Sequence, residues 1–179
     1  MALTIEAIHA AQNKTVLIEL LSAELQRFLP EEVQEDRELY FQALDSMPRG
    51  LRAMAGMYFL DISLTQNRLA WHFGDQNDER DLRETLNGLR ELELTEIAES
   101  FEKTWKFFEP HMSALQSGDY GDKEFSEWLE EIGALKLTEE MDEKILIHLK
   151  KAGRLGLLES WPVYARKYPE RCVVAAAFN

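Results

Sequence analysis

The side chains best suited to chemistry lie within nine positions and comprise an amide, a guanidinium, an indole, an imidazole and a carboxylate: Asn67, Arg68, Trp71, His72 and Asp75. On a helix, Arg68 and His72 would share a face because they are four residues apart. Such a polar pocket could orient a substrate, or supply the cation and base of an RNA-cleaving site. The same residues also describe a helix end at which Arg68 pairs with the acidic loop that follows and Trp71 packs inward.

Other signatures of catalysis or metal binding are missing from the sequence. The histidines His9, His72, His111 and His148 are scattered, and no two of them are spaced to share a metal. Cys172 is the only cysteine, and neither a glycine-rich phosphate loop nor a Gly-x-Ser-x-Gly elbow occurs. We therefore expect no catalytic residue, no metal and no cofactor, and a binding protein in preference to an enzyme.

The composition describes an acidic, folded chain. Of its 179 residues, 20 are Lys or Arg and 33 are Asp or Glu, so the formal charge is −13. Such a chain repels phosphates, which argues against nucleic acid as a direct partner. A hydrophobic content of 45% is ordinary for a folded protein. Because one cysteine favours a reducing compartment, and neither a basic leader nor an apolar run of ~20 residues is present, we expect a cytoplasmic protein without a membrane segment.

Apolar residues recur at helical intervals along most of the chain, for example at Ile97, Phe101, Trp105 and Phe108. Turn-forming residues mark loops at 74–78 and 117–122. With helices of ordinary length, ~11–12 residues, the pattern predicts an all-α fold, a single compact domain of roughly seven to nine helices. Within it we distinguish an N-terminal helical segment, 1–47, from the larger part, 48–179, and expect the two to pack as one unit.

Local signals place several helix boundaries. Pro30 separates an earlier helix from one that we expect over residues 31–47. Two Leu-x-Leu-Thr-Glu junctions follow, and in them Thr95 and Thr138 are placed to cap new helices. Gly133 is placed to end a helix from the left-handed position just beyond it.

Negative charge concentrates in residues 119–143, which contain ten acidic and two basic residues, whereas residues 144–179 contain two acidic and seven basic ones. Glutamates three or four apart on a helix hold their Cβ atoms ~5–6 Å from one another. Such rows can imitate part of the phosphate array of DNA. We name as the acidic surface the seven glutamates predicted to bind a partner from two consecutive helices: Glu124, Glu127, Glu130, Glu131, Glu139, Glu140 and Glu143.

Several longer landmarks follow one another in a recognisable order. Residues 60–73 form a leucine-framed stretch that ends in aromatic residues, and a leucine-spaced helix follows at 82–92. Met141-Asp142-Glu143 then precedes Tyr164-Ala165-Arg166-Lys167-Tyr168-Pro169-Glu170. Over roughly residues 50–172 this order resembles the DNA-mimic-protein-like family of bacterial helical domains, although Thr65-Gln66-Asn67-Arg68 stands where that family has a polar, glycine-containing core. The resemblance implies carboxylates that imitate DNA phosphates and occupy a DNA-binding protein.

Three hypotheses follow from the sequence. In the preferred one, the acidic surface binds a basic protein, either a DNA-binding protein or a toxin that this chain neutralises as an immunity-type inhibitor. In the second, the chain is an enzyme with a polar pocket near Arg68 and His72. In the third, it is a structural or self-associating helical domain, a homodimer formed through an apolar surface of Met54, Tyr58 and Trp71.

The preferred hypothesis makes one structural demand. The C-terminal part of the chain contains cations that could fold across the acidic surface: Arg154, Arg166, Lys167 and Arg171. If they did, the surface would lose the net negative charge that imitation of DNA requires.

Overall fold

The computed structural model describes residues 2–66 and 68–174. All regular structure in these ranges is helical, which confirms the predicted all-α fold, and nine of the helices there have seven residues or more. The α-helices are α1 (Ile5–Ala10), α2 (Lys14–Phe28), α3 (Glu31–Glu35), α4 (Arg37–Ser46), α5 (Arg49–Gln66), α6 (Arg68–Asp75), α7 (Glu79–Glu91), α8 (Thr95–Phe108), α9 (Met112–Ser117), α10 (Phe125–Glu131), α11 (Ala134–Lys151) and α12 (Trp161–Lys167). Three short 3-10 helices accompany them: η1 (Glu109–His111), η2 (Leu157–Ser160) and η3 (Pro169–Arg171).

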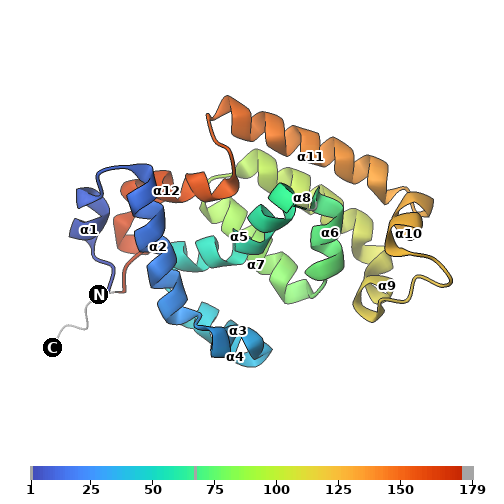
Figure 1. The fold of residues 1–179 in the computed structure, drawn as a ribbon, viewed down its shortest axis with the longest axis horizontal. Coiled ribbons are helices and arrows are strands. Elements are labelled where there is room, and N and C mark those ends of the chain that lie inside the picture. Colours follow the sequence, from blue (N-terminus) through green and yellow to red (C-terminus); the bar gives the residue numbers. More distant parts are fainter. Residues whose placement is uncertain (1, 67, 175–179) are drawn as a thin grey trace.

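The contact between α5 and α7 is the most extensive between any two elements, and it lies at the centre of the molecule (Figure 1). Two glycines allow the backbones to approach. A Cβ on Gly88 would lie 2.5 Å from the carbonyl oxygen of Ala53, and one on Gly56 would lie 2.7 Å from that of Glu84. Thr85 also donates from Oγ1 to the carbonyl oxygen of Gly56 at 2.8 Å. The two helices therefore cross at a separation that side chains at these glycines would prevent.

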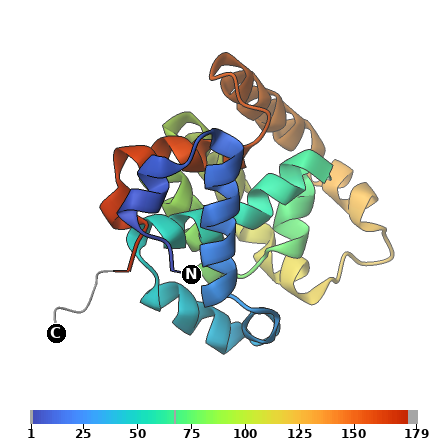
Figure 2. The ribbon, with the colours of Figure 1, turned by 60° about the vertical axis from the view of Figure 1, so that its left-hand side comes forward.

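The other helices are arranged around this pair. The long helix α11 lies across α6 and α8, while α2 and α12 pack together on the side away from α10 (Figure 1). In the turned view, α2 passes in front of α5 (Figure 2). Leu17 and Leu21 of α2 are fully buried and belong to the same apolar cluster as Leu89 of α7. The N-terminal helices thus share one core with the rest of the chain.

One predicted helix end is confirmed, and one predicted helix is wrong because it is divided in two. Gly133 follows α10 with φ of +75°, and its N–H donates to the carbonyl oxygen of Glu130 at 3.0 Å, as predicted for a glycine that ends a helix. The helix expected over residues 31–47 is instead divided into α3 and α4. Asp36 causes the division, because its carboxylate accepts the N–H groups of Glu38 and Leu39 at 2.9 and 3.0 Å and so starts α4.

The predicted threonine caps are wrong. Thr95 is the first residue of α8, and the preceding residue, Leu94, takes the N-cap position without a side-chain bond. Thr138 lies inside the continuous helix α11, where it is buried and donates from Oγ1 to the carbonyl oxygen of Ala134 at 2.9 Å. Because its hydroxyl is satisfied by the preceding turn, Thr138 can lie inside a helix and does not mark the start of one.

The apolar surface proposed for self-association is not formed as predicted. Met54 is fully buried in α5 and cannot contribute to a surface. Tyr58 and Trp71 are 42% and 43% exposed, but their rings contact different elements. Tyr58 lies 6.5 Å from Trp161 of α12, and Trp71 lies 4.9 Å from Phe125 of α10, between ring centroids.

Replacing Gly88 with alanine should destabilise the protein. The added Cβ would meet the Ala53 carbonyl oxygen, so α5 and α7 would have to separate, at a cost of about 1–3 kcal/mol as in other overpacked cores. In an uncrowded helix the same change would stabilise by roughly 1 kcal/mol, because alanine has the higher helix propensity. Urea unfolding followed by circular dichroism measures the effect. The control Asn87→Ala, at the exposed neighbouring position, should change stability by less than about 0.5 kcal/mol, and a Gly88→Ala variant as stable as the wild type would contradict the close crossing.

Candidate functional site

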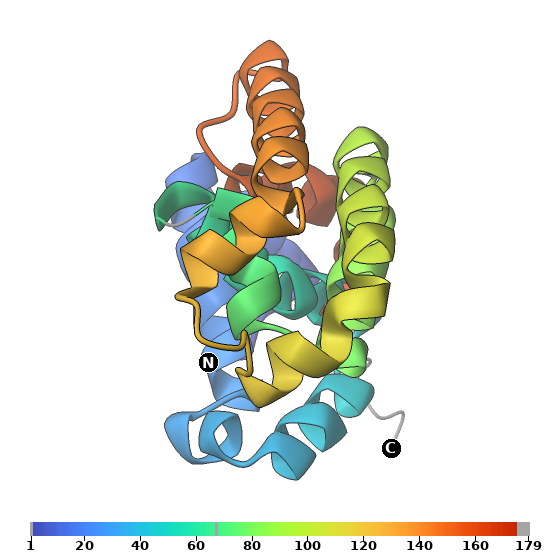
Figure 3. The ribbon, with the colours of Figure 1, turned by 90° about the vertical axis from the view of Figure 1, so that its right-hand side faces the viewer.

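The acidic surface lies on α10 and on the N-terminal half of α11, which face the viewer in Figure 3. All seven of its glutamates are exposed. On the opposite side of α10, Trp128 and Leu129 are buried, with 8% and 0% exposure. Phe125 stacks on Trp128 with 6.0 Å between ring centroids, and Tyr120 lies 4.9 Å from Trp128. This aromatic cluster fixes α10 so that its glutamates stay on the solvent side.

Two of these glutamates are held by the backbone. Glu124 is the N-cap of α10 and forms a capping box with Glu127, in which each side chain accepts a hydrogen bond from the backbone of the other residue. The N–H of Glu124 lies 3.4 Å from the Glu127 carboxylate. The positive end of the helix dipole favours negative charge at this position. The first two charges of the acidic surface therefore have a defined place relative to the helix.

Part of the acidic surface is neutralised locally. Three glutamates form exposed ion pairs with nearby cations: Lys123 with Glu131, Arg68 with Glu139 at 3.5 Å, and Lys144 with Glu140 at 2.7 Å. The hydrogen bond and charge of Lys144 lower the pKa of Glu140. Exposed pairs of this kind are weak, so a cationic partner can replace them. The other four glutamates make no ion pair within the described ranges and carry uncompensated charge: Glu124, Glu127, Glu130 and Glu143.

The last two cations of the chain pair elsewhere. Lys167 Nζ lies 2.7 Å from the carboxylate of Glu93, and Arg171 Nη1 lies 3.0 Å from that of Glu91. The bonds from Lys167 and Tyr168 lower the pKa of Glu93. Glu91 and Glu93 stand at the C-terminal end of α7 and just beyond it, away from α10. These contacts hold the end of the chain against α7.

Arg166 and Arg154 also leave the acidic surface uncovered. Arg166 donates from Nη2 to the carbonyl oxygen of Ala11 at 3.1 Å, beyond the end of α1. The pKa of Glu159 is lowered chiefly by its bond to Lys14, and the charge of Arg154 adds to this effect. Among the described residues, none of the four C-terminal cations forms an ion pair with the acidic surface. The preferred hypothesis requires that these cations do not neutralise the acidic surface, and the described contacts agree with this requirement.

The residues of the predicted polar pocket are not brought together. Asn67 lies outside the described residues. Arg68 and Asp75 are exposed, whereas His72 is completely buried. The cavity beside Arg68, of about 420 Å³, is not lined by His72 or Asp75. The four described members therefore have separate surroundings.

The alternative interpretation of these residues, a helix end paired with its loop, also needs correction. Arg68 does not pair with the loop that follows α6 but with Glu139 of α11. Trp71 is not packed inward, because 43% of it is exposed and its ring meets the edge of Phe125. The contacts made by both side chains connect α6 to the helices that carry the acidic surface.

His72 is a core histidine. Its Nδ1 lies 3.2 Å from Ser63 Oγ, and that hydroxyl lies 2.9 Å from the carbonyl oxygen of Phe59. Since the hydroxyl donates to the carbonyl, the bonds assign the proton of the neutral imidazole to Nδ1. Nε2 is buried without a partner in the described ranges, and the ring contacts Phe73 and Phe101. Burial lowers the pKa of His72 to about 3, so the ring is uncharged at neutral pH.

Asp142 is a positioning residue that sequence reasoning missed. The chain enters α6 with a left-handed φ of +71° at Arg68, and Asp142 of α11 accepts the next N–H, that of Leu69, at 3.1 Å. Burial raises the pKa of Asp142 to about 6. Its carboxylate borders the cavity beside Arg68, together with Glu139 and Glu143. The two partners of this bond are 73 residues apart, so no local spacing could have indicated it.

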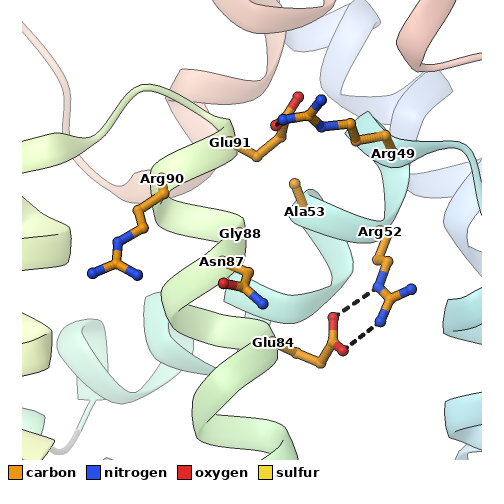
Figure 4. A pocket seen from close by; sticks show the side chains of 8 residues that line it. All are labelled: Arg49, Arg52, Ala53, Glu84, Asn87, Gly88, Arg90 and Glu91. Atoms are coloured by element: carbon orange, nitrogen blue, oxygen red, sulfur yellow. Dashed lines mark hydrogen bonds and ion pairs between the residues drawn. The ribbon is translucent and has the colours of Figure 1, made fainter.

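A polar groove of about 350 Å³ lies along the crossing of α5 and α7, as Figure 4 shows. Its arginines are already paired within the chain. Arg52 binds Glu84 through two nitrogens at 2.8 and 2.6 Å, and Arg49 forms an ion pair with Glu91. Arg90 pairs with Glu102, outside the groove lining. The groove therefore joins two helices and has no unpaired arginine for an anion.

A metal centre and a membrane-spanning helix are both absent from the described part of the chain. No three His, Cys, Asp or Glu side chains there come together as a metal ion would require. None of the helices there combines the length and the apolar character needed to cross a bilayer.

The buried His72 should make the protein sensitive to acid. Its pKa is about 3 in the folded chain against 6.5 ordinarily, so between these values only the unfolded chain takes up the proton. Its contribution to stability is complete above pH 6.5 and is lost as pH falls toward about 3. The variant His72→Phe should therefore gain stability relative to the wild type between about pH 7 and about pH 5, as measured by denaturant unfolding. Parallel pH profiles for the two proteins would contradict this assignment.

Asp142 should have the opposite pH dependence, because its pKa is raised from 3.8 to about 6 in the folded chain. The stability it contributes is complete below pH 3.8 and is lost as pH rises through about 6. Asp142→Asn keeps an oxygen that can accept from Leu69 and stays neutral, so it should be more stable than the wild type at about pH 8 and lose this advantage at about pH 4. Asp142→Ala also stays neutral but removes the acceptor, so it should be less stable than Asp142→Asn by about 1 kcal/mol at both values. Equal effects of the two substitutions would show that the bond to Leu69 is unimportant.

The comparisons with known proteins give no relative. No family model, no curated protein and no solved structure matches this chain. The resemblance to the DNA-mimic-protein-like family thus stays a prediction from the sequence.

Proposed function

We propose that this protein is an acidic binding module that acts as a DNA mimic, occupying a basic nucleic-acid-binding protein through the acidic surface. The observation that supports this most is the separation of charge. The exposed glutamates lie on α10 and α11, while Lys167 and Arg171 are bound to Glu93 and Glu91 at the end of α7. A cationic partner would therefore meet negative charge without displacing the C-terminus.

The geometry of α10 and α11 suits the binding of a basic protein. The capping box and the aromatic cluster behind α10 fix the helix, so docking would order fewer groups and lose less entropy than a flexible acidic tail would. Exposed charges attract a partner of opposite sign over about a Debye length, ~8 Å at physiological salt. We expect fast, salt-sensitive binding that depends on several glutamates together.

An immunity-type inhibitor of a basic toxin would use the same surface and the same forces. It differs only in the identity of the partner. The enzyme hypothesis draws no support from the positions of Arg68, His72 and Asp75, which do not line a common cavity. Self-association through the predicted apolar surface is disfavoured because Met54 is buried.

The proposal predicts that capture of basic proteins depends on three particular glutamates. The immobilised protein is exposed to lysate at low salt, and bound proteins are eluted with rising salt and identified by mass spectrometry. The combined variant Glu127→Gln, Glu130→Gln, Glu143→Gln removes three charges that form no ion pair with any described residue. Its capture of basic nucleic-acid-binding proteins should fall by about tenfold or more, because each lost charge weakens a cooperative electrostatic contact.

A matched control removes the same charge elsewhere. The variant Glu31→Gln, Glu32→Gln, Glu35→Gln alters three exposed glutamates of α3, and it should capture the same proteins as the wild type. Equal losses in the two variants would show that only net charge matters, and binding that resists high salt would contradict the electrostatic proposal. A single basic toxin in the eluate would support the immunity-type alternative.

A further inference from the structure

An exposed tryptophan, Trp71, lies beside the acidic surface. It belongs to α6, the helix next to α10 in Figure 3, and 43% of it is accessible to solvent. Its ring centroid lies 4.9 Å from that of Phe125, the first residue of α10, with 69° between the ring planes. Glu124, the N-cap of α10, immediately precedes Phe125. A large aromatic side chain is therefore present where the acidic surface begins.

Packing fixes the Phe125 ring that Trp71 contacts. Gly74 lies one turn after Trp71 on α6, and a Cβ on this glycine would come within 2.8 Å of the Phe125 ring. The same ring lies 5.1 Å from Tyr120 and 6.0 Å from Trp128, between centroids. An aromatic side chain with a fixed support loses little conformational entropy when a partner binds, which suits it to be an anchor of an interface.

Two uncompensated carboxylates lie near Trp71. Glu124 is the neighbour of its contact residue in α10. Asp75 is exposed one turn after Trp71 on α6. Burial and, secondly, the charge of Asp75 raise the pKa of Tyr120, so Asp75 lies close to the aromatic cluster. Since neither carboxylate forms an ion pair with any described residue, both would attract a cation that approaches Trp71.

No cation of the described residues lies over the Trp71 ring. The arginine of α6, Arg68, is instead paired with Glu139 of α11 at 3.5 Å. Arginines of this chain do cover other rings: the guanidinium of Arg80 lies 4.1 Å from the centroid of Phe41. Among aromatic side chains, tryptophan attracts a cation most strongly. The ring best suited to a cation is thus without one in the described part of the chain.

An arginine matches this combination of an indole and carboxylates better than a lysine does. Its guanidinium is planar, so it stacks on an aromatic face while its N–H groups bind carboxylates, whereas the lysine ammonium is compact and strongly hydrated. We propose that Trp71 determines specificity at the acidic surface by stacking on an arginine side chain of the basic partner, whose charge Glu124 and Asp75 attract. This inference rests on the function proposed above and adds to it a preference for arginine over lysine.

Two peptides of equal charge test this preference: hexa-arginine and hexa-lysine, both with blocked ends. Each is titrated at low salt into the ¹⁵N-labelled full chain, and the affinity is obtained from the shifts of its amide resonances. The wild type should bind hexa-arginine more tightly than hexa-lysine. Hexa-arginine should also shift the indole N–H resonance of Trp71, which is identified as the one missing from the spectrum of Trp71→Phe.

Three substitutions locate the effect. Trp71→Leu should weaken the binding of hexa-arginine about threefold or more, because it removes a cation–π contact, and should change that of hexa-lysine less. Trp71→Phe keeps a ring and should retain part of the preference. The control Tyr58→Leu removes a ring that is 42% exposed but contacts Trp161 of α12, and it should leave both affinities unchanged. An arginine preference that is undiminished in Trp71→Leu would overturn the proposal.

The role of Trp71 and the function of the acidic surface fail in different ways. If the wild type binds neither peptide at low salt, the acidic binding function is contradicted and the role of Trp71 with it. If the wild type binds both peptides equally, or if hexa-arginine binds without shifting the indole resonance of Trp71, the role of Trp71 alone is contradicted. The indole resonance is read in the wild type, so this result does not depend on the folding of any variant.

Discussion

The close approach of α5 and α7 at Gly56 and Gly88 is the constraint on which the arrangement of charge depends. Because these backbones touch, the polar face of α7 lies directly beside α5, and Arg52 can bind Glu84 through two of its guanidinium nitrogens. The same geometry brings Glu91 to Arg49 at the other end of the crossing. A steric property of two glycines thus determines which charges meet.

The consequence reaches the C-terminus. Glu91 is 9% exposed and binds two arginines, Arg49 and Arg171, while Glu93 beside it binds Lys167. These acids hold η3 and the end of α12 at α7. The strongly acidic helices α10 and α11 and the basic end of the chain are both present in the sequence, yet they do not neutralise each other. That separation gives the molecule a negative face despite its mixed charge.

Much of the fold could be predicted from the sequence, because helical periodicity and turn residues are local. The loops near 74–78 and 117–122 and the helix end at Gly133 follow from such signals. What could not be predicted depends on distant contacts. His72 is polar by type, but Phe101 and Ser63 enclose it in the core, and Asp142 supports the start of α6 from 73 residues away. Exposure of the glutamates was predictable, whereas the position of the C-terminal cations was not.

The claim that the acidic surface stands clear of the C-terminal cations can be tested directly by zero-length carbodiimide cross-linking, which joins only amines and carboxylates that are in contact. Lys167 is the informative amine, because it lies near the end of the chain and 2.7 Å from Glu93. In dilute protein, mass spectrometry should find Lys167 joined to Glu93. Lys167 joined to Glu127 or Glu130 within one molecule would contradict the account.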